Sequence, residues 1–583
     1  MKFTSLNSRT RSTLRRYLGD LYPQANTAEL QQELERRLTL HAKELAILSQ
    51  HSSRLSYKDV LLIVYPDQIQ QEDASPLDTL RAFMTEYLQE VISGIHVLPF
   101  FPYSSDDGFS IIDFRTVDPR LGKWEDVRAL ASNFRLMVDL VINHISSQSG
   151  WFQSFMQGVE PYSNYFIRMH PSTDLSLVVR PRDLPLLTPF DTEHGQEYVW
   201  TTFSPDQVDL NFKNPAVLFE ILEVLLLYIR NGAQIIRLDA IAFLWKEPGT
   251  ASIHLVQTHT VVKLLHLILA AVAPWVHLIT ETNVPHAENL SYFGDGNDEA
   301  HLVYQFALPP LTLHTLLSGD ATQLTRWAAE NSLPSRTTTF LNFLASHDGI
   351  GLRPAQDILP PDSIERLVAW TTARKGYISS RQVAGQQIEP YELNITYFDA
   401  LAPEVNVTQP SSLWIDRYLC SQAIMLALQG IPGIYFHSLI GGRNNLMGVE
   451  RTGQKRSINR EKFQLDALRQ ALNNPAVYTA QVFSRYCTLL NARKSHSAFD
   501  PYGRQDVLDL NPCVFAVLRA SPFDESQVLC LHNISSNAVV LEISHGLIPT
   551  SRGLDLLCNE RVDTGSIRLQ PYQHRWIDLD EKE

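Results

Sequence analysis

Short hydrophobic runs recur along the chain, and most of them end in polar or ionisable residues. The runs are LLIVYPD (61–67), IHVLPF (95–100), RLMVDLVINH (135–144), AQIIRLDA (233–240), HLITETN (277–283), LVYQFALP (302–309), TTTFLNFLASHD (337–348) and IPGIYF (431–436). Nearly continuous apolar runs of this length are typical of strands that are buried on both faces of a parallel sheet. We therefore predict eight buried parallel strands.

Amphipathic helical patterns occupy several of the intervals between these runs, for example 215–232 and 258–274. A strand followed by a helix, repeated eight times, predicts an α/β fold of the (β/α)8 TIM barrel type. Two intervals, 145–210 and 349–420, are longer than such a connection needs. We predict that the first is an inserted domain B and the second another loop subdomain within the barrel.

The two ends of the chain follow other patterns. Leucines among charged residues predict a helical N-terminal extension at 1–54, and short alternating runs predict a C-terminal antiparallel β-domain at 496–583. The catalytic barrel is then expected to comprise 55–144 and 211–495.

Composition narrows the classes of partner. A formal net charge of −14 gives no general reason to bind nucleic acid. No apolar run approaches the roughly 18 residues of a membrane span, and the N-terminus lacks the pattern of a secretory signal. We expect a cytoplasmic protein that needs neither membrane nor nucleic acid, and the oligomeric state stays open. No metal-ligand spacing or nucleotide-binding glycine loop is present, so no metal or organic cofactor is expected.

Three acidic residues follow three different predicted strands: Asp239, Glu281 and Asp348. The carboxyl ends of barrel strands meet at one mouth, so these side chains should converge there. Each acid alone could instead cap a helix or pair with an arginine, but the set favours chemistry. Cleavage of a glycosidic bond with retention needs a nucleophilic carboxylate and a carboxylic acid. Asp239 and Glu281 suit these roles, and Arg237, on the same strand face as Asp239, would keep it ionised.

The segments DLVINH, IIRLDAIAF, LITETN and FLASHD resemble, in order and spacing, the four signature regions of the α-amylase superfamily, glycoside hydrolase family 13. More narrowly, HVLPFFPYSSDDGFSIIDF, VRPRDLPLLTPF and SINREKF are similar to the sucrose phosphorylase subfamily, over about 55–583. The resemblance implies a retaining double displacement in which Asp239 is the nucleophile, Glu281 the acid/base and Asp348 the stabiliser of the transition state.

The resemblance also implies a pocket for a single glucose unit. Asp67 and Arg460 would together close its far side, with Arg456 as the competing arginine. His96 would contact the C6 hydroxyl, and Phe203 would form an aromatic wall, although a lone phenylalanine is more often a core residue. The remaining substrate-binding candidates are Gln207, Arg237, His347, Tyr391 and Glu392, and His144 is a further donor to sugar hydroxyls.

A phosphorylase differs from a hydrolase in the nucleophile that attacks the glucosyl-enzyme, so it must capture phosphate. By resemblance, Arg182 and Tyr391 bind this phosphate, which would act as a co-substrate. An arginine in a loop is otherwise most often a solvated surface residue, and only the resemblance raises Arg182 above that reading.

The segment SSDDGFS, the N-terminal extension, and Glu392 at a position where sucrose phosphorylases generally have glutamine resemble the glucosylglycerate phosphorylases. This resemblance implies a hexosyltransferase that converts glucosylglycerate and phosphate to α-glucose 1-phosphate and glycerate. Arg182 and Arg353 are candidate cations for the glycerate carboxylate. Sucrose, sucrose 6-phosphate and glucosylglycerol remain possible donors, and an α-glucosidase or transglucosidase, or a barrel without activity, remain alternatives. Some relatives bind calcium, which would make Asn143 a candidate ligand, but we expect none.

Overall fold

The computed structural model describes residues 6–48, 54–382, 388–405, 407, 409–544, 546–548 and 551–580. Eight parallel strands close into a barrel, in the order β1, β16, β12, β11, β10, β9, β4, β3. They are β1 (Leu61–Val64), β3 (Gly94–Val97), β4 (Arg135–Leu140), β9 (Ala233–Leu238), β10 (His277–Thr280), β11 (Leu302–Tyr304), β12 (Thr339–Asn342) and β16 (Ile431–Tyr435). Each falls on one of the eight hydrophobic runs, with β3 beginning one residue before its run, so the predicted fold class is confirmed.

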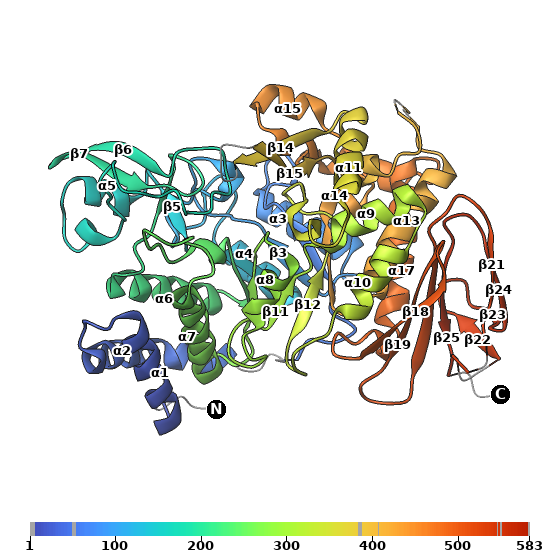
Figure 1. Ribbon diagram of the computed structural model, residues 1–583, viewed down its shortest axis with the longest axis horizontal. Helices are drawn as coiled ribbons and strands as arrows, with labels where there is room; N and C mark the ends of the chain where they lie inside the picture. The colour runs from blue at the N-terminus through green and yellow to red at the C-terminus, as the bar shows by residue number, and fades with distance from the viewer. Residues whose placement is uncertain are drawn as a thin grey trace.

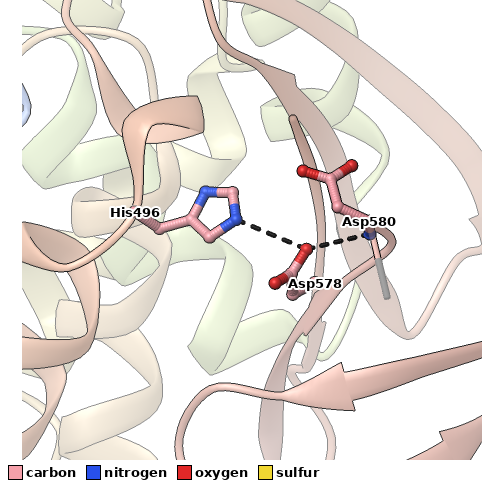
Figure 2. A group of neighbouring side chains, drawn as sticks. All are labelled: His496, Asp578 and Asp580. Carbon is pink, nitrogen blue, oxygen red and sulfur yellow. Dashed lines mark hydrogen bonds and ion pairs between the residues drawn. The ribbon is translucent and has the colours of Figure 1, made fainter. Parts of the chain in front are cut away.

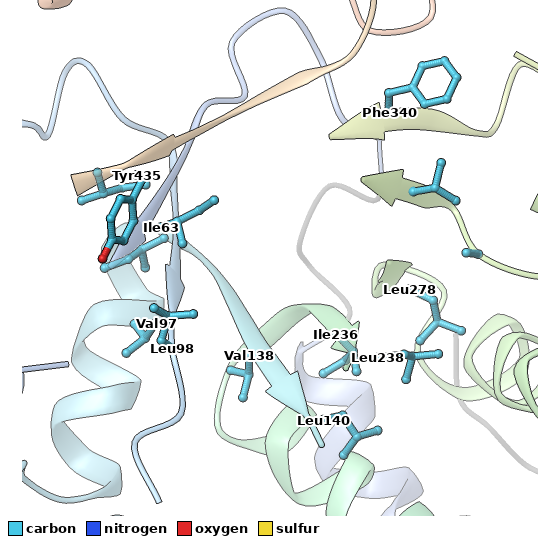
Figure 3. Close-up of a cluster of buried hydrophobic side chains, with 14 of the residues drawn as sticks. Ile63, Val97, Leu98, Val138, Leu140, Ile236, Leu238, Leu278, Phe340 and Tyr435 are labelled. Atoms are coloured by element: carbon cyan, nitrogen blue, oxygen red, sulfur yellow. The ribbon is translucent and has the colours of Figure 1, made fainter. Parts of the chain in front are cut away.

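Alternation along each strand separates the inside of the barrel from its outside. In β9, Ile236 and Leu238 belong to the large cluster between the strands and the surrounding helices (Figure 3), whereas Ile235 belongs to a cluster inside the barrel. Arg237 therefore points inward, and Asp239, two residues later, continues on the same side at the mouth. Asp239, Glu281 and Asp348 come after the last residues of β9, β10 and β12, so they lie at the carboxyl ends of these strands.

Helices surround the barrel (Figure 1). They include α3 (Pro76–Tyr87), α4 (Trp124–Asn133), α6 (Pro215–Arg230), α7 (Val256–Val272), α8 (His286–Leu290), α9 (Leu308–Ser318), α10 (Thr322–Glu330), α13 (Ser412–Ala427) and α17 (Tyr478–Lys494). Local sequence sets where several begin: Ser75 caps α3, Asn214 caps α6, and a proline follows each cap in the first turn.

The N-terminal helices α1 (Ser8–Leu21) and α2 (Thr27–Leu48) lie against α7 and α6 on the side of the barrel, in dark blue in Figure 1. The Tyr22 hydroxyl donates to the carbonyl of Phe212 at 3.1 Å, and Arg37 approaches Glu223 at 3.3 Å. These helices lie within the predicted extension, of which 1–5 and 49–53 are outside the described residues.

Both long intervals carry additional structure above the barrel mouth. The first contains α5 (Gly150–Met156), β6 (Leu187–Thr192) and β7 (Gly195–Trp200), after β5 (His144–Ser146), which pairs with β8 (Gln207–Asp209). The second contains α11 (Pro361–Ala373) and a sheet of β13 (Ile350–Gly351), β15 (Ile388–Asn394) and β14 (Tyr377–Gln382). Helix α13 starts inside the predicted range 349–420 and packs on α9 and α17, so that range overlaps the helical layer of the barrel. Residues 383–387, 406 and 408 lie outside the described part of this range.

The last segment forms a six-stranded antiparallel sheet, shown in red in Figure 1. Its strands, in spatial order, are β18 (Arg504–Asn511), β19 (Val514–Ala520), β20 (Gln527–Asn533), β25 (His574–Asp578), β22 (Arg552–Asp555) and β23 (Glu560–Asp563), with β21 (Val539–Glu542) and β24 (Ser566–Leu569) forming a separate pair. His496, just after α17, meets Asp578 of this sheet at 3.4 Å (Figure 2). Within the described ranges, no helix is long and apolar enough to cross a membrane.

Candidate active site

A buried arginine organises the charged groups at the barrel mouth. Nη1 of Arg237 lies 2.5 Å from Oδ1 of Asp139 and 2.7 Å from Oδ1 of Asp239. The parallel register pairs Asp139 with Arg237 across β4 and β9, which fixes this contact. Behind it, Nε2 of His96 donates to Oδ2 of Asp139 at 2.8 Å. The network holds the Asp239 carboxylate in one orientation.

Glu281 lies beside Asp239 because their strands are adjacent. Ile279 of β10 pairs with Arg237 of β9, so the residues two positions further along, Glu281 and Asp239, extend to the same level. The amide of Ala240, whose φ of 48° turns the chain away after Asp239, donates to Oε2 of Glu281 at 3.0 Å. Nη2 of Arg237 is 3.7 Å from the same oxygen. Two carboxyl groups therefore share one arginine.

Burial raises the pKa of both carboxyl groups above that of an exposed aspartate or glutamate. It raises the pKa of Asp239 to about 6, against the attraction of Arg237. It raises the pKa of Glu281 to about 7, again against Arg237 and with help from the Asp239 charge. Because Arg237 is closer to Asp239 than to Glu281, the proton is held preferentially by Glu281. This is the division of labour that a nucleophile and a general acid require.

Asp348 is the third acid at the mouth, and it is held ionised. Burial would raise its pKa, but Arg456, at 2.5 Å from Oδ1, His347 and Arg460, at 3.8 Å, keep that pKa below the usual range of an aspartate. The ring of His347 stacks on Phe109 with 4.8 Å between centroids, which fixes this side of the pocket. Asp348 therefore presents a permanent negative charge to a ligand at the mouth.

These side chains face one pocket. The residues predicted for the site that line it are Arg182, Phe203, Gln207, Asp239, Glu281, His347, Asp348 and Tyr391, together with His144 and the competing arginine Arg456. They come from strand ends, from the first long interval and from β15, as long loops at the carboxyl face of a barrel allow. Carboxylates, two guanidinium groups and an aromatic wall suit a small polyhydroxylated and anionic substrate.

Comparison with known proteins agrees with this geometry. The model of the α-amylase catalytic domain matches residues 63–349. A glucosylglycerate phosphorylase of Allomeiothermus silvanus is 49% identical over 90% of this chain and 91% of its own length. One of Escherichia coli is 41% identical over 96% and 99%, and a sucrose phosphorylase of Agrobacterium vitis is 33% identical over 76% and 88%.

The chain belongs to the glycoside phosphorylases of the α-amylase family. The crystal structure of a sucrose 6F-phosphate phosphorylase from Thermoanaerobacter thermosaccharolyticum superposes with a TM-score of 0.72 at 24% identity, covering 88% of this chain and 99% of that one, which shows the shared fold.

Asp67 and Arg460, predicted to close the far side of the sugar pocket, contact other partners in this phosphorylase. Nζ of Lys462 lies 2.6 Å from Oδ1 of Asp67, and Nη1 of Arg460 lies 2.5 Å from Oδ2 of Asp107. Nε of Arg460 also donates to the carbonyl of His347 at 2.8 Å. Lys462, two residues after Arg460, is the cation that contacts Asp67, and Arg460 lies behind the wall of the pocket.

His96 and Glu392 also lie behind the lining rather than in it. His96 is buried against Asp139, with Nε2 2.8 Å from Oδ2, and its Nδ1 has no partner among the described residues, so the contact with a sugar hydroxyl stays a prediction. Glu392 is fully buried, and its two oxygens accept from Nε and Nη2 of Arg456 at 3.0 and 2.6 Å. Gly349 makes room for this pair, because a Cβ there would lie 2.6 Å from Cγ of Glu392. Both residues position other groups of the site.

The structure adds two lining residues with polar side chains that were not predicted, Asp106 and Asn283. Asp106 and Asp107 have φ values of 54° and 47°, a left-handed conformation that costs non-glycine residues energy and is concentrated at functional sites. The signal in the sequence was the Asp-Asp-Gly run before Phe109. Asn283 follows Glu281 by two residues, and its Oδ1 is buried with no partner among the described residues.

The candidate calcium ligand Asn143 contacts a cationic side chain instead of an ion. Nζ of Lys246 lies 2.5 Å from Oδ1 of Asn143 and 2.6 Å from Oδ2 of Asp209. Elsewhere in the described ranges, His496, Asp578 and Asp580 are close enough to share a cation (Figure 2), but Asp580 is exposed and His496 already contacts Asp578. That group joins the C-terminal sheet to the barrel, far from the acids in sequence and in the fold.

Proposed function

We propose that this protein is a retaining glucosylglycerate phosphorylase, which converts glucosylglycerate and phosphate to glycerate and α-glucose 1-phosphate. The observation that carries the proposal is the pair of Asp239 and Glu281 on one arginine, facing a pocket that also contains Arg182 and Tyr391. The relatives that are 41–50% identical over most of the chain support the choice of donor.

In the first step, Oδ of Asp239 attacks C1 of the glucosyl unit from one face while Glu281 protonates the leaving oxygen of glycerate on the other. The C1–O bond breaks, glycerate leaves and a glucosyl ester of Asp239 forms. Arg237 orients Asp239, and the ionised Asp348 stabilises the positive charge that develops on the ring. The three acids thus have three different charge requirements, which their surroundings supply.

In the second step, an oxygen of phosphate attacks C1 on the face that glycerate left. The ester bond to Asp239 breaks, Glu281 accepts the proton of the attacking phosphate oxygen, and α-glucose 1-phosphate forms, so two inversions give net retention. Capture of phosphate falls to Arg182 and to the Tyr391 hydroxyl, because a guanidinium and a neutral donor both match a tetrahedral oxyanion. Burial raises the pKa of Tyr391 to about 12, so its hydroxyl keeps its proton.

The decisive experiment incubates the purified protein with glucosylglycerate, sucrose, sucrose 6-phosphate or glucosylglycerol, each with and without phosphate. The expected result is phosphate-dependent α-glucose 1-phosphate from glucosylglycerate, and much less from the other donors. Free glucose as the main product regardless of phosphate would identify a hydrolase and reject the proposal. A β-configured product would reject the double displacement, and inactivity of wild type and Asp239→Asn alike would indicate a barrel without catalysis.

No metal or organic cofactor is part of this proposal. The reaction as written needs only carboxyl groups, arginines and phosphate as co-substrate. Lys246 supports this view at the one position where a calcium ligand was considered, because its ammonium group already contacts Asn143 and Asp209.

A further inference from the structure

We propose that Arg182 is a shared anion site that binds the phosphate in one half of the reaction and the carboxylate of glycerate in the other. This inference rests on the proposed function and names the residue that recognises the acid group of its acceptor. It also decides between Arg182 and Arg353, the two cations that the sequence left as candidates.

The second guanidinium in the pocket lining, that of Arg456, is already paired with two carboxylates. Its Nη1 lies 2.5 Å from Asp348, and its Nε and Nη2 contact Glu392 at 3.0 and 2.6 Å. Two carboxylates thus offset one positive charge, and Glu392 is fully buried, so solvent does not weaken the bond. Arg456 therefore has no net positive charge left to offset that of an incoming anion.

The other cations near the site are also committed. Arg237 lies behind the nucleophile between Asp139 and Asp239, and Arg460 contacts Asp107 and a backbone carbonyl. Arg353 is outside the pocket lining, and its Nη2 approaches Glu288 at 3.8 Å. These three arginines therefore hold other protein groups in place and do not bind the incoming anion.

Arg182 differs from all of them. It lines the pocket, is partly exposed, and has no hydrogen-bond or carboxylate partner among the described residues. Tyr391 lines the same pocket, so the guanidinium and a neutral hydroxyl donor face one space. A planar guanidinium binds both a planar carboxylate and a tetrahedral phosphate through paired hydrogen bonds. The N–H groups of Arg182 can therefore bind either anion.

The rest of the lining makes this cation necessary. Asp106, Asp239, Glu281 and Asp348 all face the same pocket, so an anion that enters it meets a surface rich in carboxyl groups. One unpaired guanidinium offsets the charge of one anion at a time. Phosphate and glycerate must also attack C1 from the same face, because both displace Asp239 from C1 of its glucosyl ester. When glycerate attacks, its hydroxyl oxygen bonds to C1, the ester bond breaks, and Glu281 accepts the hydroxyl proton.

The test uses α-glucosyl fluoride as donor, because it glucosylates the enzyme with release of fluoride, so that neither a carboxylate nor a phosphate group takes part in that step. Acceptors are phosphate, glycerate and, as a neutral analogue of glycerate, glycerol. For Arg182→Gln we expect the apparent KM for phosphate and for glycerate each to rise about 10- to 100-fold, the range for losing hydrogen bonds to a charged group. Transfer to glycerol should fall far less, and Arg182→Lys should recover part of both anion affinities.

The matched control is Arg353→Gln, which removes the competing cation and should leave the KM for both anions within about twofold of wild type. In wild type, phosphate should inhibit transfer to glycerate competitively. Loss of phosphate affinity with unchanged glycerate affinity in Arg182→Gln would overturn the shared site, as would loss of glycerate affinity in Arg353→Gln. A wild-type enzyme that transfers to phosphate but never to glycerate would instead reject the proposed function, so the two failures are distinguishable.

Discussion

Replacing Glu281 by glutamine removes the one proton donor positioned over the leaving oxygen while keeping the shape of the side chain. Positioned general acids contribute about 10²–10⁴-fold in rate, so turnover of glucosylglycerate should fall by that factor. An activated donor such as α-glucosyl fluoride needs little protonation, so formation of the glucosyl-enzyme from it should be affected by less than about tenfold. The comparison of the two donors isolates the proton from the rest of the site.

The pH dependence gives the same prediction a second readout. With a pKa of about 7, half of the Glu281 carboxyls are protonated at pH 7 and about a tenth at pH 8. With a pKa of about 6, Asp239 loses its nucleophilic charge on the acid side. For wild type with glucosylglycerate, kcat/KM should therefore be bell-shaped, with its maximum between the two values.

The assay is stopped-flow or initial-rate kinetics on both donors from pH 5 to about 9, with wild type as reference. For Glu281→Gln with the fluoride, the alkaline limb of glucosyl-enzyme formation should disappear while the acid limb remains. An equal loss of rate on both donors, or an alkaline limb that persists in the variant, would refute the assignment of Glu281 as the acid.

Further predictions concern the groups around the acids. Asp139→Asn removes a negative charge that raises the pKa of Asp239, so the acid limb of kcat/KM should move to lower pH; an unmoved limb would contradict the network. Glu392→Gln weakens the ion pair between the fully buried Glu392 and Arg456 and should lower both kcat and the thermal midpoint, whereas Glu389→Gln, at a partly exposed position of the same strand, should change neither. EDTA should leave activity and thermal midpoint unchanged, because the ammonium of Lys246 occupies the position considered for calcium; a loss restored by calcium would refute this.

The fold could be predicted because burial on both faces leaves a signal within each strand. Runs such as 233–240 are nearly continuous in apolar residues, and the polar residues after them fall at one end of the barrel by topology alone. The placement of Asp239, Glu281 and Asp348 at one mouth follows from the same two facts. The acceptor preference needed the resemblance, since no spacing of residues encodes it.

Pairing between loops could not be predicted in the same way. Asp67 follows β1, Asp107 lies in the loop after β3, and Arg460 and Lys462 come much later in the chain. Which cation meets which carboxylate depends on differences of a few ångströms between loops, and charge alone does not rank the choices. The same reason explains why Arg456 and Arg460 could not be separated before the structure placed Arg456 in the lining.

The arrangement of two acids on Arg237 has a consequence for the catalytic cycle itself. The charge of Asp239 is one of the forces that keep Glu281 protonated. Once Asp239 becomes an ester that charge is gone, and the attraction of Arg237 for Glu281, 3.7 Å away, is no longer shared with it. The affinity of Glu281 for its proton therefore drops at the moment when it must turn from donor into acceptor, and returns when the ester breaks. Formation and cleavage of the ester on Asp239 therefore lower and restore the pKa of Glu281, and no other residue is needed for this change.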